Sequence, residues 1–212
     1  MAKLIVPLVL AAALGASLAA QQHSRLFRPE QLGTLEGPDR DAWQRPDQIM
    51  DKLLIAEGSA VADLGAGGGW FTMRLAARVG PNGIVYAEDV QPPMIEAISK
   101  RIARAQLRNV KPVLGTQLDP RLPGRVDAVL IVDAYHEMEQ PLVILGKLVR
   151  ALKPQGRIGI VEFKKDGWGP GGPMDERMDP ERIVRDAEAA GLRLLSHETF
   201  LRYQYMLVFV RR

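Results

Sequence analysis

The 212-residue chain contains no cysteine. This excludes disulfide bonds, thiolate metal sites and a cysteine nucleophile. The net charge is only +3, and the basic residues are spread along the chain without interleaved aromatic residues, so no nucleic-acid footprint is indicated. Histidine is also scarce, and of the three present only His136 lies where chemistry is expected. The length and the 47% hydrophobic content indicate one domain with a short extension.

The central stretch, residues 61–71, reads Val-Ala-Asp-Leu-Gly-Ala-Gly-Gly-Gly-Trp-Phe. It predicts a buried strand, a glycine turn and a helix from residue 70 to about residue 79. A dinucleotide-binding turn requires G-x-G-x-x-G. That spacing is absent, because the third glycine position holds Trp70 when counted from Gly65 and Thr72 when counted from Gly67.

An acid, Asp63, stands two residues before the first glycine of this turn. Its carboxylate would repel a pyrophosphate held nearby, whereas it would attract a ligand with a cationic end. A tight strand-to-helix turn without any ligand would use the same glycines. The order apolar-apolar-Asp-apolar-Gly-x-Gly-x-Gly resembles the first motif of the class I S-adenosylmethionine-dependent methyltransferases, whose methyl donor carries a sulfonium and an ammonium group and no phosphate.

The resemblance runs from about residue 38 to the C-terminus and lies nearest to the broad small-molecule methyltransferase group. It implies a Rossmann-like α/β fold with an open seven-stranded sheet. This sheet would be mostly parallel with one antiparallel strand near the C-terminus, and helices would cover both faces. The implied activity is transfer of a methyl group from S-adenosylmethionine to an oxygen, nitrogen, sulfur or carbon atom of an unidentified acceptor, a small molecule, by in-line displacement.

Donor binding is implied at the ends of the first three predicted strands. Strand 84–87 ends in Glu88-Asp89, and an acid there can accept both ribose hydroxyls. The family form favours Asp89 over Glu88. After strand 110–114 the family often has an acid for the adenine amino group, but Thr116 cannot carry that charge, which leaves Asp119 or backbone groups. The expected donor-binding residues are Asp63, Gly65, Ala66, Gly67, Gly69, Asp89, Val90, Thr116 and Asp133.

A polar loop, residues 133–137, follows the predicted fourth strand, residues 126–132. Ligands of open α/β sheets lie beyond the carboxyl ends of such strands. Tyr135 could hold the sulfonium by its ring face, and His136 could accept a proton from the acceptor. Asp133 or Glu137 could orient the imidazole. Alternatively, His136 caps the next helix or lines the pocket without catalysing anything.

The same loop also offers two candidate metal ligands. Asp133 and His136 are spaced for a metal ion, but no third ligand is evident, so no metal is predicted. We therefore expect Asp133, Tyr135 and His136 to be the catalytic residues.

The remaining segments complete the predicted domain. Leu-Lys-Pro-Gln-Gly-Arg before strand 157–163 strongly resembles the family, and Glu162 near the end of that strand could face the pocket. Residues 164–173 are predicted to be a loop at the substrate entrance. In the family the segment before the glycine strand covers the donor, which makes Arg40 and Trp43 candidates for donor or substrate contact, although Trp43 could instead pack a helix on the sheet. Helices are expected from residue 46 up to a stop at Gly58, and at 92–104, 139–152 and 180–190. Closing strands are expected at 192–200 and 205–210.

Three segments are predicted along the chain: residues 1–20 a signal peptide or short membrane anchor, residues 21–37 a linker, and residues 38–212 the methyltransferase domain. An apolar run over residues 4–20 contains Ser17-Leu18-Ala19, which fits a small-x-small cleavage site. An uncleaved run would associate with the membrane. Export or anchoring conflicts with the cytosolic supply of the methyl donor, so a cytoplasmic location stays open.

Two other functions use the same scaffold. An aminopropyl transferase would need an acidic polyamine pocket, which the mixed loop 164–174 does not suggest. An exported, non-catalytic binding module would fit a compartment that lacks the donor. The sequence identifies neither the acceptor nor the oligomeric state.

Overall fold

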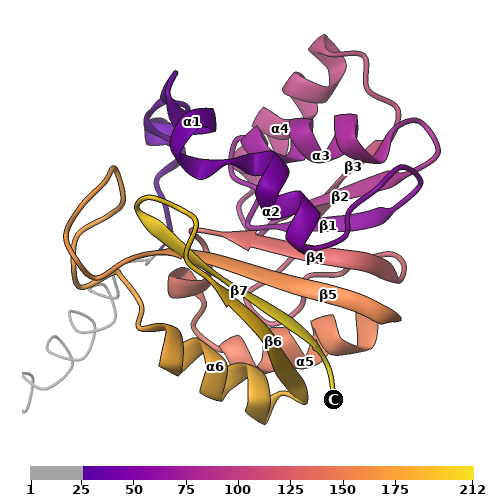
Figure 1. Ribbon diagram of the computed structural model, residues 1–212. Helices are drawn as coiled ribbons and strands as arrows, with labels where there is room; N and C mark the ends of the chain where they lie inside the picture. Colours follow the sequence, from indigo (N-terminus) through magenta and orange to yellow (C-terminus); the bar gives the residue numbers. More distant parts are fainter. Residues whose placement is uncertain (1–25) are drawn as a thin grey trace, which may run out of the picture.

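The computed structural model describes residues 26–212 and shows one seven-stranded sheet with helices on both faces (Figure 1). The strand order is β3-β2-β1-β4-β5-β7-β6. Strand β7 runs antiparallel to both of its neighbours, and the β1–β5 pairings are parallel. This confirms the predicted Rossmann-like sheet with one antiparallel strand near the C-terminus. The strands are β1 (Ala60–Leu64), β2 (Ile84–Asp89), β3 (Val110–Leu114), β4 (Val126–Val132), β5 (Leu152–Phe163), β6 (Leu192–Glu198) and β7 (Gln204–Arg211).

The helices form the two outer layers and the cover of the sheet. They are η2 (Pro29–Leu35), α1 (Arg40–Gln44), α2 (Pro46–Lys52), α3 (Trp70–Val79), α4 (Pro92–Arg104), η3 (Tyr135–Glu137), α5 (Pro141–Ala151) and α6 (Pro180–Ala189). Proline occupies the first turn of α2, α4, α5 and α6, where its missing N–H and preset φ cost nothing. The predicted helix starts at residues 70 and 180 are confirmed.

Two hydrophobic clusters pack against opposite faces of the sheet, because side chains alternate along each strand. In β4, Val129 and Ile131 join the cluster that contains the apolar residues of α5 and α6. Ala128 and Leu130 join the cluster that contains those of α2 and α3. The central strands are therefore buried on both faces, as their unbroken apolar runs predicted.

Strand β5 begins earlier than the sequence indicated. A helix end and a loop were expected before residue 157, but Leu152 already pairs with Val126, and the register shifts before Arg157 pairs with Ala128. A Cβ on Gly156 would lie 2.8 Å from the Leu152 side chain. Glycine thus allows the chain to bulge between the two paired segments.

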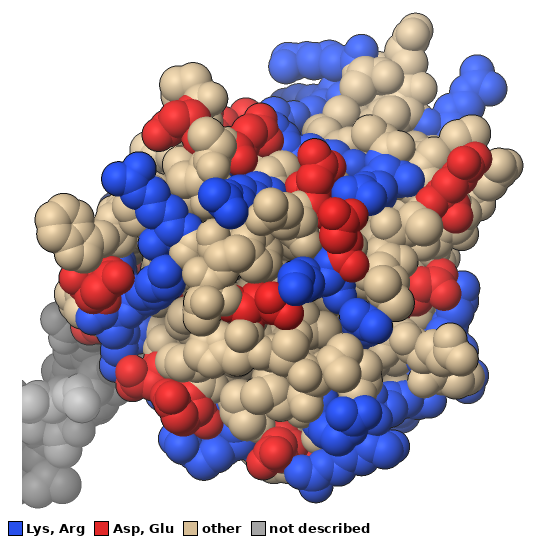
Figure 2. Space-filling view, viewed as in Figure 1, with Lys and Arg blue, Asp and Glu red and all other residues tan. Residues whose placement is uncertain are grey.

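The N-terminal expectations are only partly covered by the structure. The predicted signal peptide or anchor, residues 1–20, lies outside the described residues. The described part of the predicted linker contains η2 and is not simply extended chain. Within residues 26–212 no helix is both long and apolar enough to cross a membrane. On the face shown in Figure 2, basic and acidic side chains are interspersed.

Candidate functional site

A cavity of about 570 Å³ lies where β1, β2, β4 and β5 end, a volume within the range of small-molecule sites. Its wall contains more acidic than basic side chains. Burial is the largest cause that raises the pKa of five of these acids, Asp63, Glu88, Asp89, Asp133 and Glu137. Burial disfavours the charged form of these carboxyl groups, and a cationic ligand in the cavity would stabilise that form. The lining acids are Glu36, Asp63, Glu88, Asp89, Asp133, Glu137, Glu162 and Glu176, against the basic residues Arg28, Arg40, His136 and Arg177.

The glycine turn after β1 forms the floor of the cavity. Gly65, Gly67 and Gly69 all have positive φ, at 68°, 54° and 82°, a conformation that side chains with a Cβ rarely adopt. A Cβ on Gly65 would also lie 2.6 Å from the Cβ of Ala134. The turn and the loop after β4 therefore approach each other closely. Gly65, Ala66 and Gly67 line the cavity, whereas Gly69 caps α3 and does not.

Asp89, at the end of β2, is held by backbone N–H groups. Its Oδ2 accepts from Gly67 N at 3.0 Å and its Oδ1 from Gln91 N at 2.9 Å. The carboxylate is thus oriented where the glycine turn meets the cavity. Asp63 is also buried and accepts a 2.6 Å hydrogen bond from Thr72 Oγ1, and burial raises its pKa to about 6.

Glu88 is a second acid that lines the cavity beside Asp89, although the family form favours Asp89 as the ribose acceptor. Burial, followed by the charge of Asp89, raises the pKa of Glu88 to about 8. A Cβ on Gly115 would lie only 1.8 Å from Glu88 Oε1. The missing side chain after β3 therefore makes room for a carboxyl group from the neighbouring strand. Val90, Thr116 and Gln117 line the same part of the cavity.

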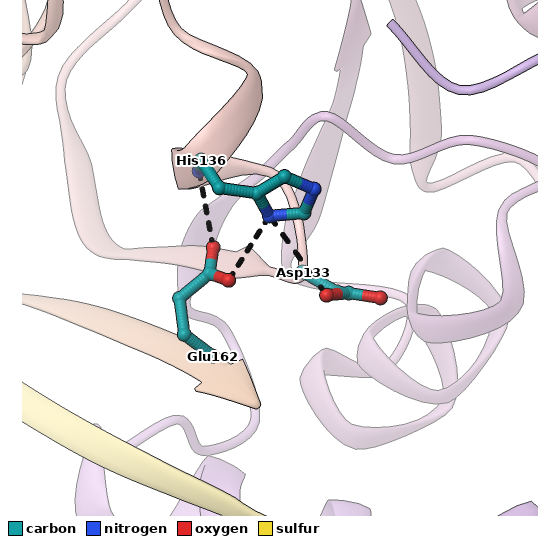
Figure 3. Close-up of side chains that lie close together, drawn as sticks. All are labelled: Asp133, His136 and Glu162. Carbon is teal, nitrogen blue, oxygen red and sulfur yellow. Dashed lines mark hydrogen bonds and ion pairs between the residues drawn. The ribbon is translucent and has the colours of Figure 1, made fainter. Parts of the chain in front are cut away.

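Glu162 at the end of β5 orients His136, as Figure 3 shows. Glu162 Oε2 lies 3.0 Å from His136 Nδ1, and Oε1 accepts from Tyr135 N at 2.8 Å and from His136 N at 3.3 Å. Asp133 Oδ1 lies farther from the same Nδ1, at 3.9 Å. The other candidate for orienting the imidazole, Glu137, instead accepts a hydrogen bond from Phe27 N on its Oε1, at 3.2 Å. The pairing of His136 with Glu162 could not be predicted from sequence spacing, because Glu162 lies 26 residues away on the neighbouring strand.

The electrostatics of this pair favour a protonated imidazole. Burial alone would lower the pKa of His136, but the hydrogen bond and charge of Glu162, with Asp133 and Glu137, raise it to about 9. Asp133 has its pKa raised by burial and by the charge of Glu162. Asp133 also has φ of 53°, and such backbone strain in a non-glycine residue clusters at functional sites.

Two sequence-predicted roles are not supported by the observed positions. Tyr135 does not line the cavity: its ring is buried in the core, and its hydroxyl donates to Asp186 Oδ2 at 3.0 Å. Asp119, offered as the adenine acid, forms a 2.7 Å ion pair with Lys147 and is not part of the cavity wall. In both cases the residue belongs to a segment that borders the cavity, but its side chain points away from the cavity.

The segment predicted as a linker covers the cavity. Phe27 O accepts a hydrogen bond from Gln91 Nε2 at 2.9 Å. Arg101 pairs with Glu36 and donates to Gly68 O at 2.9 Å. These contacts hold residues 26–36, which include η2, against the glycine turn and α4.

Asp133, His136 and Glu162 also form a group that could hold a metal ion, with one ligand atom from each lying within 4.8 Å of the others. Glu162 is the third ligand that was not evident from the sequence. However, its two oxygens already accept from His136 Nδ1 and from two backbone N–H groups. The observed hydrogen bonds describe a histidine–glutamate pair.

Comparisons with known proteins agree with this geometry. Residues 61–156 match the model of a methyltransferase domain family. An uncharacterized methyltransferase of Mycobacterium tuberculosis is 37% identical over 128 residues, 58% of this chain and 49% of that protein. A demethylmenaquinone methyltransferase of Geobacillus is 26% identical over 117 residues, 55% of this chain and 50% of that protein. The chain thus spans about half the length of these curated relatives.

The solved structures extend the likeness to the whole fold. A SAM dependent methyltransferase from Aquifex aeolicus superimposes with a TM-score of 0.81 and 27% identity, over 87% of this chain and 98% of that one. S-adenosylmethionine, the cofactor of this family, fits the cavity, since its cationic groups suit the excess of buried carboxyls and the end of β2 offers a carboxylate for the ribose. The glycine turn, the two buried acids at the end of β2 and the matched sequences all support a class I S-adenosylmethionine-dependent methyltransferase.

Proposed function

We propose that this chain transfers a methyl group from S-adenosylmethionine to a small-molecule acceptor. One observation carries the proposal: a single cavity contains both the carboxylate of Asp89, held against the glycine turn, and the His136–Glu162 pair. Binding groups for a donor therefore face a titratable group that could act on an acceptor. The Geobacillus relative is named for a small molecule, demethylmenaquinone, which supports a small acceptor here.

Donor binding is assigned to residues at the ends of β1, β2 and β4 and to Arg40 on α1. Asp89 accepts the ribose hydroxyls, because its orientation is fixed by the N–H groups of Gly67 and Gln91. Asp63 and Asp133 offset the cationic groups. Arg40, whose guanidinium carbon lies 4.2 Å from the Trp70 ring centroid, suits the donor's carboxylate.

Glu88 is assigned to the adenine. The family position after β3 lacks an acid here, and the Glu88 carboxyl occupies the space beside Gly115 instead. With its pKa raised to about 8, Glu88 is largely protonated at pH 7. Its hydroxyl can donate to a ring nitrogen while its carbonyl oxygen accepts from the adenine amino group.

Catalysis depends first on alignment. The bound donor supplies an electrophilic methyl carbon, whose bond to sulfur breaks, with the electron pair left on sulfur, as the acceptor atom bonds to it. Holding both partners in line can supply about 7–11 kcal/mol of the barrier reduction. His136 receives the proton of the acceptor on Nε2, because Glu162 occupies Nδ1. This role requires the neutral imidazole, which becomes abundant only as the pH approaches about 9.

Binding and transfer assays with the full chain test this function. Calorimetric titration should show micromolar binding of S-adenosylmethionine and S-adenosylhomocysteine. Incubation with methyl-labelled donor and a panel of small hydroxylated, amino and thiol compounds should give a labelled product. Transfer of an aminopropyl group would assign the fold to the aminopropyl transferases, and binding without any transfer would favour a non-catalytic module. Failure of the folded chain to bind either ligand would refute the proposal.

For the N-terminus we propose an export signal over residues 1–20. The support is the apolar run ending in Ser17-Leu18-Ala19. N-terminal sequencing of the protein purified from its native cells would show a start near residue 20 or 21 if the signal is cleaved. An intact Met1 in the soluble cytoplasmic fraction would contradict export, and an intact Met1 in the membrane fraction would indicate an anchor.

A further inference from the structure

A second cavity, of about 240 Å³, adjoins the donor cavity. Its wall combines polar side chains with three aromatic rings from separate parts of the chain: Trp43 on α1, Phe163 at the end of β5 and Tyr203 just before β7. The Trp43 ring centroid lies 6.0 Å from that of Phe163 and 5.9 Å from that of Tyr203. An apolar cavity of about 150 Å³ already accommodates benzene. This one therefore has room for a substituted ring.

The two cavities meet beside the reacting groups. Arg40, Asp133 and Phe163 line both of them. Asp133 Oδ1 lies 3.9 Å from His136 Nδ1. A molecule in the aromatic cavity would therefore present its near edge to the region between the donor and His136.

A chain of side-chain hydrogen bonds ends at this aromatic cavity. Arg40 Nε donates to Gln44 Oε1, and Gln44 Nε2 donates to Gln204 Oε1 at 2.8 Å. The direction of the chain is fixed, because a guanidinium can only donate and the oxygen of Gln44 must therefore face it. Gln204 is consequently left with its amide nitrogen, a donor, as the terminal group.

That terminal donor lacks a partner. Within residues 26–212, Gln204 Nε2 is buried and makes no hydrogen bond. Gln204 is fully buried, lines the aromatic cavity and is the cross-strand partner of Phe163. A buried unsatisfied donor costs about 1–3 kcal/mol. An oxygen atom of a ligand in this cavity would remove that cost.

We propose that the aromatic cavity binds the methyl acceptor, and that the acceptor is a planar aromatic compound with an uncharged carbonyl oxygen that accepts from Gln204 Nε2. The inference rests on the proposed methyltransferase function and names its substrate class. The three rings favour a flat π system. An uncharged oxygen is favoured over a carboxylate, because the acids Asp39 and Asp133 outnumber the one arginine that lines the cavity, Arg40, and that arginine already donates to Gln44.

Matched probes test each part of this proposal. The full chain, saturated with S-adenosylhomocysteine, is titrated with 3-hydroxyacetophenone and with 3-ethylphenol, while the probe's NMR signals are followed. The two compounds share the ring and the hydroxyl group, and only the first has a carbonyl. We expect 3-hydroxyacetophenone to bind about five- to tenfold more tightly, the worth of roughly one net hydrogen bond. The non-aromatic analogue 1-(3-hydroxycyclohexyl)ethanone should bind more weakly than either.

Variants connect the preference to the residues. Gln204→Leu should abolish the difference between the two phenols, whereas Gln155→Leu, the same change at an exposed position of β5, should preserve it. Trp43→Leu should weaken both phenols together. Binding of S-adenosylhomocysteine by each variant reports an intact fold and donor site, so a variant that fails to fold is recognised and Trp43→Leu provides the second test.

The outcomes separate the two proposals. If the chain binds S-adenosylhomocysteine but shows no preference for the carbonyl probe, or if Gln204→Leu keeps that preference, the acceptor assignment is overturned and the methyltransferase function stands. If the folded chain does not bind S-adenosylhomocysteine, the proposed function fails instead. The phenol titration, repeated without that ligand, then shows whether the aromatic cavity discriminates alone.

Discussion

The two halves of the cavity are built in different ways. In the donor half, Asp89 is held by Gln91, two residues away, and by Gly67, 22 residues away, across neighbouring parallel strands. In the acceptor half, His136 is paired with Glu162, 26 residues away, and Gln44 is paired with Gln204, 160 residues away. The donor half is thus a local strand-turn-helix unit with its adjacent strand. The acceptor half exists only when α1, β5, β7 and their loops have assembled.

This difference predicts that the two halves can be damaged separately. Changes in the donor half should alter affinity for S-adenosylmethionine, and changes in the acceptor half should alter turnover or acceptor selection. A variant that lowered donor affinity and turnover equally would show that the two halves do not act separately. The following tests are arranged from the largest expected effect to none.

Replacing the histidine of the acceptor half should have the largest effect. His136→Asn removes the proton acceptor but keeps a side-chain amide that can bond Glu162. A positioned general base contributes about 10²–10⁴-fold, so kcat with an acceptor found by screening should fall by roughly that factor. Calorimetry should show donor affinity within about twofold of the unmodified chain. A kcat that does not change would show that His136 only lines the cavity.

The donor half should respond to Asp89→Asn. A hydrogen bond to a charged group contributes about 1.5–3 kcal/mol, so the Kd for S-adenosylhomocysteine should rise by about ten- to a hundredfold. The measurement is calorimetric titration, with Asp47→Asn, at an exposed acid of α2, as the control. An unchanged Kd with loss of turnover would contradict the assignment of Asp89 to the donor.

The pH dependence should sharpen the comparison within the acceptor half. Glu162 stabilises the protonated imidazole, so Glu162→Gln should lower the pKa of His136 from about 9, and the rising limb of the pH–rate profile should move to lower pH with it. NMR titration of the histidine ring resonances measures this without an acceptor, since the chain has three histidines. An unmoved His136 pKa would mean that another group holds the proton.

The same pair affects stability with a definite sign. The folded-state pKa of His136 is raised above its ordinary value of 6.5. The stabilisation is therefore fully present below pH 6.5 and is lost as the pH rises through about 9. Thermal unfolding of the unmodified chain should show this loss between those pH values. In Glu162→Gln the pH-dependent part should be smaller, and an equal dependence in both proteins would contradict the ion pair.

Metal removal should have no effect. Glu162 uses both oxygens in hydrogen bonds to His136 and its neighbour, so we expect the group with Asp133 to act without an ion. Treatment with a chelator followed by gel filtration should leave methyl transfer unchanged. A loss of activity restored by a divalent cation would instead make Asp133, His136 and Glu162 metal ligands.

Sequence reasoning was most successful where structure depends on neighbours along the chain. The bounds of β3, β4 and α3 were predicted as observed, because unbroken apolar runs and a glycine turn specify buried strands and the helix that follows. It was least successful where a side chain could face either of two sides. Tyr135 turned into the core toward Asp186, and Glu137 turned to Phe27, although both lie in the predicted loop.

The sequence by itself determined the class of fold, the glycine turn and the acid at the end of β2, because each is encoded by residues within one strand-turn-helix unit or at a regular distance from it. Only the tertiary structure decided that Glu162 orients His136, that residues 26–36 cover the cavity, and that Gln204 ends a hydrogen-bond chain beside three aromatic rings. These contacts join segments far apart in the chain. Which residues meet depends on the order of the strands in the sheet and on the face that each side chain occupies. Neither can be predicted from the spacing of residues along the chain.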